Sequence, residues 1–205
     1  MLISDAWYSL GAYFRTGGPV MLPLLLVSLA MWLLIADRAI ILRRLSLRTL
    51  SGPLAWECIR DNRLPDPNEG GAVALLIIRF LDRRSGDPSL DRNILDELVL
   101  SMNRSLNRFL PLIGVLATVA PLLGLLGTVT GMMSTFEVMS LFGTGNAKGM
   151  AGGISEALIT TQTGLIVAIP GLYMKNFLDR RAQALRRQLI ATGYYLRRHL
   201  QEAPC

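Results

Sequence analysis

The chain has 205 residues, a formal net charge of +6, 51% apolar residues and a positive mean hydropathy. A soluble domain of this length usually has a mean hydropathy below zero, so the composition favours a membrane protein. A single histidine and two cysteines without a spacing pattern exclude a zinc site and a disulfide framework. The sequence contains no nucleotide-binding loop and no Ser/His/Asp set, so it predicts no cofactor, no metal and no catalytic residue.

The first apolar run follows a short N-terminal segment, residues 1–19, that does not resemble a cleavable signal. Residues 20–36 are uncharged and would be about 25 Å long as a helix, slightly shorter than a hydrocarbon core of about 30 Å. Asp37 and Arg38 can extend their polar ends to the interface, and apolar residues continue beyond them. We therefore expect a first transmembrane helix at 20–42.

Two more segments are long enough to cross a bilayer. Residues 109–136 form an uncharged run of 28 residues, which spans with some tilt. Residues 149–175 form the third candidate, and Glu156 is the one charged side chain between Lys148 and the terminal Lys175. Only a short loop, 137–148, separates these two candidates.

Basic residues predict the orientation. The N-terminal segment and the 137–148 loop carry few of them, whereas many arginines follow the first and third spans. The positive-inside rule then predicts that the N-terminus and this loop lie outside and that the C-terminus lies inside, in the cytoplasm. The Arg-rich tail directly follows a span, which indicates lipid contact and no nucleic acid.

The polar regions have helical patterns and no strand pattern. Region 43–108 is expected to be cytoplasmic and helical, with Asp87 and Pro88 as the cap and first residue of a helix. This helix is predicted to run without interruption into span two, and the tail 176–205 is predicted to continue span three. The predicted fold is all-α, an integral membrane protein with three transmembrane helices and long helices that extend into the cytoplasm.

Glu156 is the most informative single residue. A carboxylate inside a span costs about 2.5–3.5 kcal/mol on insertion scales, so it indicates a proton or ion pathway. The alternative is that Glu156 lies near the membrane surface, only eight residues after Lys148, and has a structural role.

Hydroxyl groups accompany this carboxylate. Thr160 and Thr163 share its helix face at 100° per residue, whereas Thr161 is rotated by about 140°. Span two contributes Thr118, Thr128 and Thr130. These hydroxyls either line a hydrated path or simply donate to carbonyls of their own helix.

Small residues and prolines mark spans two and three. Glycines at spacings of three, four or more residues predict close helix–helix approach, and the interior prolines leave carbonyls that need other donors. The glycines are Gly124, Gly127, Gly131, Gly153 and Gly164, and the prolines are Pro121 and Pro170.

Two motifs resemble signatures of the MotA/TolQ/ExbB proton channel family. Residues 120–133 read APLLGLLGTVTGMM and resemble APxxGLLGTVxGM; residues 153–170 read GISEALITTQTGLIVAIP and resemble GIxEALxTTxxGLxVAIP. The chain lacks a fourth span and a large torque-generating domain, so it is most similar to the ExbB and TolQ branches.

The resemblance implies that the membrane is a bacterial inner membrane, with its outer side facing the periplasm. It also implies a homopentamer around two copies of a single-span partner like ExbD or TolR, whose membrane aspartate carries protons. It implies that Glu156, Thr161 and Thr128 line the proton pathway, with Thr160 secondary, and that the chain is a motor subunit and not an enzyme. A TonB-like periplasmic protein would then be energised for outer-membrane transport. Three alternatives stay open: a TolQ-like role with a TolA-like transducer in envelope integrity and cell division, a motor for constriction or gliding, and a passive membrane scaffold.

Overall fold

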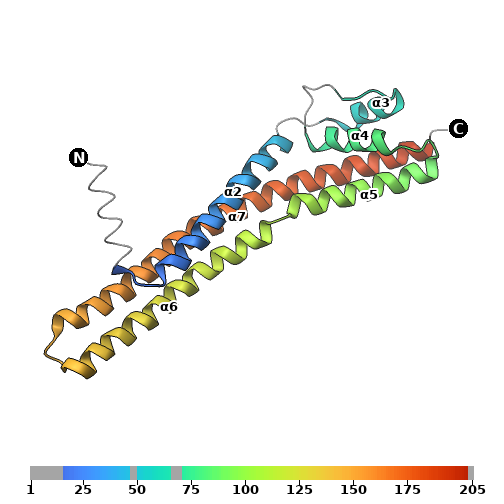
Figure 1. The fold of residues 1–205 in the computed structure, drawn as a ribbon. Coiled ribbons are helices and arrows are strands. Elements are labelled where there is room, and N and C mark those ends of the chain that lie inside the picture. The colour runs from blue at the N-terminus through green and yellow to red at the C-terminus, as the bar shows by residue number, and fades with distance from the viewer. Residues whose placement is uncertain (1–15, 47–49, 66–70, 203–205) are drawn as a thin grey trace, which may run out of the picture. The chain divides into compact units, whose positions relative to one another are not determined.

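The computed structural model describes residues 16–46, 50–65 and 71–202, and within these ranges it contains helices and no strand. Most of the predicted N-terminal segment therefore lies outside the described residues. The chain divides into two compact units, and each is described by itself. Unit 1 is Met1–Ile35 with Leu112–Lys175, and unit 2 is Ala36–Pro111 with Asn176–Cys205. The labelled helices in Figure 1 are α2 (Met21–Ser46), α3 (Gly52–Arg60), α4 (Ala72–Arg83), α5 (Pro88–Asn107), α6 (Leu110–Phe142) and α7 (Ala147–Glu202).

Unit 1 is built from the N-terminal part of α2, nearly all of α6 and the first half of α7. Each of these three helices is long and apolar enough to cross a membrane, which confirms the predicted all-α fold with three candidate spans. The turn at 143–146 joins α6 to α7, and the two helices run antiparallel (Figure 1). Pro121 and Pro170 lie inside α6 and α7, and both helices continue through them.

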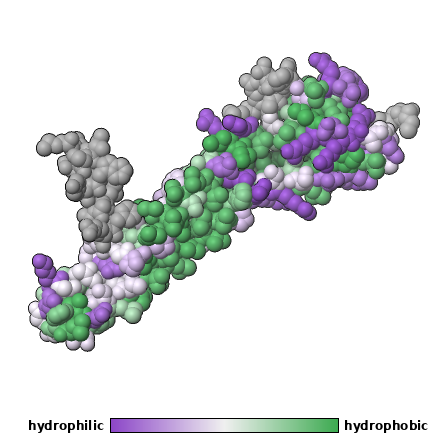
Figure 2. Space-filling model, in the orientation of Figure 1, coloured by the Kyte–Doolittle hydropathy of each residue, from purple (hydrophilic) through white to green (hydrophobic). Residues whose placement is uncertain are grey.

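The outward faces of unit 1 are apolar. Leu122 on α6, Leu158 on α7 and Leu22 on α2 are each more than 60% exposed, and Figure 2 shows apolar surface along these helices. So much exposed apolar surface is unfavourable in water, where large patches mark contact with lipid or protein. These faces are therefore suited to contact with lipid or with other protein surfaces.

Unit 2 has a hydrophobic core of the kind found in water-soluble helical domains. Amphipathic α4 and α5 bury one face each, and the C-terminal half of α7 contributes leucines at helical spacing. Phe80 and Leu95 are fully buried. Other fully buried members of this core are Ile59, Leu76, Ile77 and Leu189.

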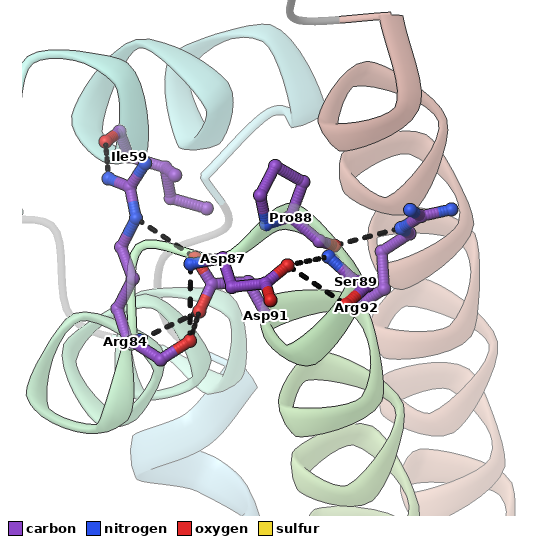
Figure 3. A network of polar contacts seen from close by, with 8 residues as sticks. Ile59, Arg84, Asp87, Pro88, Ser89, Asp91 and Arg92 are labelled. Atoms are coloured by element: carbon purple, nitrogen blue, oxygen red, sulfur yellow. Dashed lines mark hydrogen bonds and ion pairs between the residues drawn. The ribbon is translucent and has the colours of Figure 1, made fainter. Parts of the chain in front are cut away.

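A polar network joins α3, α4 and α5 (Figure 3). Asp91 is 1% exposed and accepts hydrogen bonds from the Ser85 amide at 2.8 Å, the Ser85 hydroxyl at 3.0 Å and Arg84 Nε at 3.3 Å. The same guanidinium donates through Nη1 to the Ile59 carbonyl at 3.1 Å, in the last turn of α3. One arginine therefore links the end of α3 to the first turn of α5.

Asp87 caps α5, as the sequence predicts. The Ser89 amide donates to its carboxylate at 2.8 Å and the Ser89 hydroxyl at 2.9 Å, and these donors hold the pKa of Asp87 below its ordinary value of 3.8. Because the folded pKa is lower than the unfolded one, ionised Asp87 stabilises the fold above the unfolded pKa, and this contribution is lost as pH falls through the folded pKa.

We expect Asp87→Asn to weaken the acid dependence of unit 2 stability. Asparagine remains a good cap but does not ionise, so it removes the component that titrates below about pH 4. Denaturant unfolding of both proteins between about pH 5 and pH 3 measures the difference. Parallel pH profiles of the two proteins would contradict the prediction.

The prediction of one uninterrupted helix from residue 89 into span two is wrong. α5 ends at Asn107 and α6 begins at Leu110, and Phe109 between them has a left-handed φ of +66°. Pro111 provides the physical reason. In a continuous helix it could not donate to the Asn107 carbonyl, and its ring would clash with that carbonyl. In the first turn of a new helix neither problem arises.

Arg38 lies beside this break in unit 2. Its side chain is nearly buried, Nη1 donates to the Ser105 carbonyl at 3.3 Å, and the guanidinium lies 4.9 Å from the Phe109 ring centroid. Arg108 lies 4.8 Å from the same ring. These cation–π contacts favour the unusual backbone at Phe109 and connect α2 to the end of α5.

Candidate functional site: the α6–α7 helix pair

The two helices that carry the predicted site touch backbone to backbone in unit 1. A Cβ placed on Gly124 would lie 3.0 Å from the Thr160 carbonyl oxygen and 3.1 Å from the Thr161 Cα. A Cβ on Gly131 would lie 2.6 Å from the Gly153 carbonyl oxygen. Approach this close is possible only because these positions have no side chain.

The other predicted packing glycines lie at the same contact. Gly164 faces the Ala120 carbonyl oxygen, 2.8 Å from where its Cβ would be. Gly127 packs directly on the Thr160 side chain, and Gly153 packs on the Thr135 hydroxyl. The structure thus brings all five glycines together along one seam between α6 and α7. Pro121 is half-buried and Pro170 is exposed.

Thr160 and Thr161 have different surroundings. Thr160 is fully buried in the seam, and its hydroxyl donates to the carbonyls of Glu156 and Ala157, at 3.0 Å each. Thr161 is half-buried and donates to the carbonyls of Ala157 and Leu158, at 3.0 Å each. Of the two, Thr161 has the more accessible oxygen.

Thr128 on α6 resembles Thr161. It is half-buried, and its hydroxyl donates to the Leu125 carbonyl at 2.6 Å. Since a hydroxyl has one proton and two lone pairs, a threonine that donates to its own backbone can only accept from a second group. Thr128 and Thr161 are therefore hydrogen-bond acceptors, ready for a water molecule or for a protonated carboxyl group.

Glu156 is half-buried, and the contact that its side chain makes lies outside the α6–α7 seam. Its carboxyl packs against the backbone of Gly18, in the turn that precedes α2, where a Cβ would collide with Oε1. Among the residues that the structure describes, Glu156 has no ion-pair partner. The structure does not bring Glu156 and Thr161 together into one hydrogen-bonded cluster.

Sequence reasoning missed two contributors. Thr135 is 5% exposed and donates to the Gly131 carbonyl at 3.0 Å, so it completes the seam at its far end. Gly18 adopts a φ of +67° and supports Glu156. The Gly17-Gly18-Pro19 sequence is a turn signal, and it could have drawn attention to this position.

The third helix of unit 1, α2, packs against α7 close to the contact between α7 and α6. Gly171 on α7 contacts Met31 of α2 and lies near Ala117 of α6, with 3.4 Å from its Cβ position to the Ala117 Cβ. Met31 is fully buried. Within the described residues, no group of three or more His, Cys, Asp or Glu side chains that could hold a metal ion is found.

These features define a class: a multi-pass membrane protein with three apolar helices, two of which pack through glycines and carry accessible threonines. The chain belongs to the MotA/TolQ/ExbB proton channel family, whose model matches residues 72–190, more than half of the chain. It is also 36% identical, over 170 residues, to the biopolymer transport protein ExbB-like 3 of Synechocystis sp.. That match covers 78% of this chain and 80% of the relative.

Proposed function

We propose that this chain is the pore-forming subunit of an inner-membrane motor driven by the proton-motive force, like ExbB or TolQ. Five copies surround two copies of a single-span ExbD- or TolR-like partner, whose membrane aspartate takes up and releases protons. The complex energises a periplasmic transducer of the TonB type for outer-membrane transport. Family membership and the similarity to an ExbB-like transport protein support this proposal.

The membrane topology that accompanies this function has three spans, at 20–42, 109–136 and 149–175. Segment 1–19 and loop 137–148 face the periplasm. Region 43–108 and tail 176–205 face the cytoplasm, where a water-soluble core like that of unit 2 is stable. The distribution of arginines supports this orientation.

The single observation that carries the mechanism is the hydrogen bonding of Thr128 and Thr161. Each hydroxyl donates to its own helix and so presents only an acceptor. A protonated aspartic acid is a donor, whereas an ionised aspartate is an acceptor only. Thr128 and Thr161 together form a surface of hydrogen-bond acceptors, here called the threonine wall. This wall favours the protonated aspartic acid of the partner over the ionised aspartate, so each protonation changes the preferred position of the partner. Glu156 precedes Thr161 by five residues on α7, and about 140° of helix rotation separates the two side chains, so Glu156 acts from a different face of the helix.

A matched pair of substitutions tests this wall. We expect Thr161→Val to reduce proton flux about tenfold, the effect of one lost hydrogen bond of about 1.4 kcal/mol. Thr128→Val should act in the same direction. Thr130→Val is the control, because its hydroxyl donates to the Gly127 carbonyl at 3.0 Å in the same way but points to the opposite side of α6 from Thr128.

The measurement is proton uptake by liposomes that contain this chain together with its partner. Equal flux in the Thr161→Val and Thr130→Val proteins would overturn the assignment of the wall. Glu156→Gln extends the test, since a neutral amide of the same shape removes the ionisable group and should reduce the flux.

A passive scaffold is the second candidate, and the glycine seam favours it because tight packing alone would account for the seam. A scaffold would tolerate the loss of Glu156 and of both threonine hydroxyls, while substitution of a seam glycine would abolish assembly. The flux series and copurification of the partner therefore separate the two functions. A TolQ-like subunit differs from an ExbB-like one only in the transducer that copurifies.

A further inference from the structure

The turn that precedes α2 packs on one face of α7. α2 begins at Met21, whose amide donates to the Gly18 carbonyl at 3.3 Å, and the Leu24 amide donates to the Val20 carbonyl at 3.3 Å. Gly18 has a φ of +67°, a conformation that glycine adopts without strain. The chain therefore enters α2 through a turn that depends on glycine.

Two adjacent glycines of this turn contact two residues of α7 that share one face. A Cβ on Gly17 would lie 3.3 Å from Cγ2 of Ile159, and a Cβ on Gly18 would lie 3.2 Å from Cγ of Glu156 and would overlap the carboxyl group itself. Glu156 and Ile159 are three residues apart, so both side chains lie on the same side of α7. The contact is within unit 1.

We propose that the Gly17–Val20 turn is a positioning element for Glu156: it holds the carboxyl against the Gly18 backbone and covers one side of it. This inference rests on the proposed proton pathway for its functional meaning. A glutamate has three rotatable side-chain bonds, and within the described residues no cation fixes this one. The glycine backbone is therefore what restricts its position, and the N-terminal turn controls from which side Glu156 can be reached.

Gly18→Ala tests the contact directly, and Gly143→Ala is its matched control. The two glycines have nearly the same φ, +67° and +68°, so alanine meets the same backbone strain at both. Only at Gly18 does the new methyl group collide with Glu156, since nothing lies within 4 Å of a Cβ on Gly143. A difference between the two variants therefore reports the contact and not the strain.

The readout is covalent labelling of Glu156 by a hydrophobic carbodiimide, quantified by mass spectrometry on the full chain in liposomes. We expect severalfold faster labelling in Gly18→Ala and no change in Gly143→Ala, because the methyl group pushes the carboxyl out from under the turn.

Ile159→Ala is a second variant, which removes the support that α7 gives to Gly17 without changing the turn itself. It should also speed labelling of Glu156, and it tests the positioning role of the turn if Gly18→Ala does not fold. Labelling at the wild-type rate in the folded variants would overturn the inference. Labelling needs no proton flux, so an unchanged labelling rate would contradict the positioning role of the turn without contradicting the role of Thr128 and Thr161. Conversely, unchanged flux in the threonine variants would not affect the conclusion drawn from labelling.

Discussion

Gly153→Ala should destabilise the α6–α7 pair by about 1–3 kcal/mol, whereas Gly152→Ala, one residue earlier, should be neutral or slightly stabilising. A Cβ on Gly153 would lie 2.5 Å from the Gly131 carbonyl oxygen and 2.9 Å from the Thr135 backbone nitrogen. Both are backbone atoms of α6, so the helices must move apart to accept the methyl group. A Cβ on Gly152 meets nothing within 4 Å.

Unfolding of the detergent-solubilised protein, followed by its helical signal during titration with a denaturing detergent, measures both variants. Gly152 and Gly153 lie in the same helix and both are changed to alanine, so the gain in helix propensity is the same at both. A difference in stability between the two variants therefore comes from the contact with α6. Equal stability of the two variants would show that α6 and α7 do not approach through Gly153.

A double substitution sharpens this result. A Cβ on Gly131 would meet the same carbonyl of Gly153, at 2.6 Å, and the Ala157 nitrogen at 2.8 Å. Once Gly153→Ala has separated the helices, Gly131→Ala should cost less than it does alone. A coupling energy of about 0.5 kcal/mol or more between the two sites would demonstrate one shared contact.

The spans and the seam were predictable from sequence for physical reasons. A bilayer requires long apolar helices, and lipid gives helices no hydrophobic drive to associate, so small residues such as Gly127 and Gly131 mark the contact. The direction in which each threonine side chain points was harder to predict from the sequence. Helical angles alone group Thr160 with Glu156, but Thr160 lies inside the seam, since its position relative to α6 decides its burial.

The break at Phe109 and the turn at Gly18 escaped prediction for different reasons. Pro111 is a local signal that favours a break, whereas the helical pattern that continues across it favours one helix, and the structure follows the local signal. The Gly18 contact joins residues far apart in the sequence, and no local pattern connects a turn before α2 to a carboxylate on α7. Local chemistry predicts where a helix stops, but only the packed structure shows what its end touches.

Asp91→Ala should lower the free energy of unfolding of unit 2 by about 2–4 kcal/mol, the second large effect that the structure predicts. The substitution leaves the Ser85 amide without its acceptor and leaves Arg84 without its carboxylate, in a site where Asp91 is 1% exposed. Glu97→Ala on the same helix is the control. Its side chain is 71% exposed and lies 3.7 Å from Arg83, a surface pair that contributes less than about 1 kcal/mol.

Hydrogen exchange distinguishes this network from general destabilisation. Arg84 donates both to Asp91 and to the Ile59 carbonyl, so loss of Asp91 frees the guanidinium and loosens its hold on α3. The amides of α3 should therefore exchange faster in Asp91→Ala than in Asp91→Asn, which keeps an acceptor for Ser85 and the shape of the site. Equal exchange of α3 in the Asp91→Ala and Glu97→Ala proteins would mean that α3 is held by its apolar contacts alone. Faster exchange confined to Asp91→Ala would identify a buried carboxylate on α5, reached through one arginine, as the group that fastens α3 to unit 2.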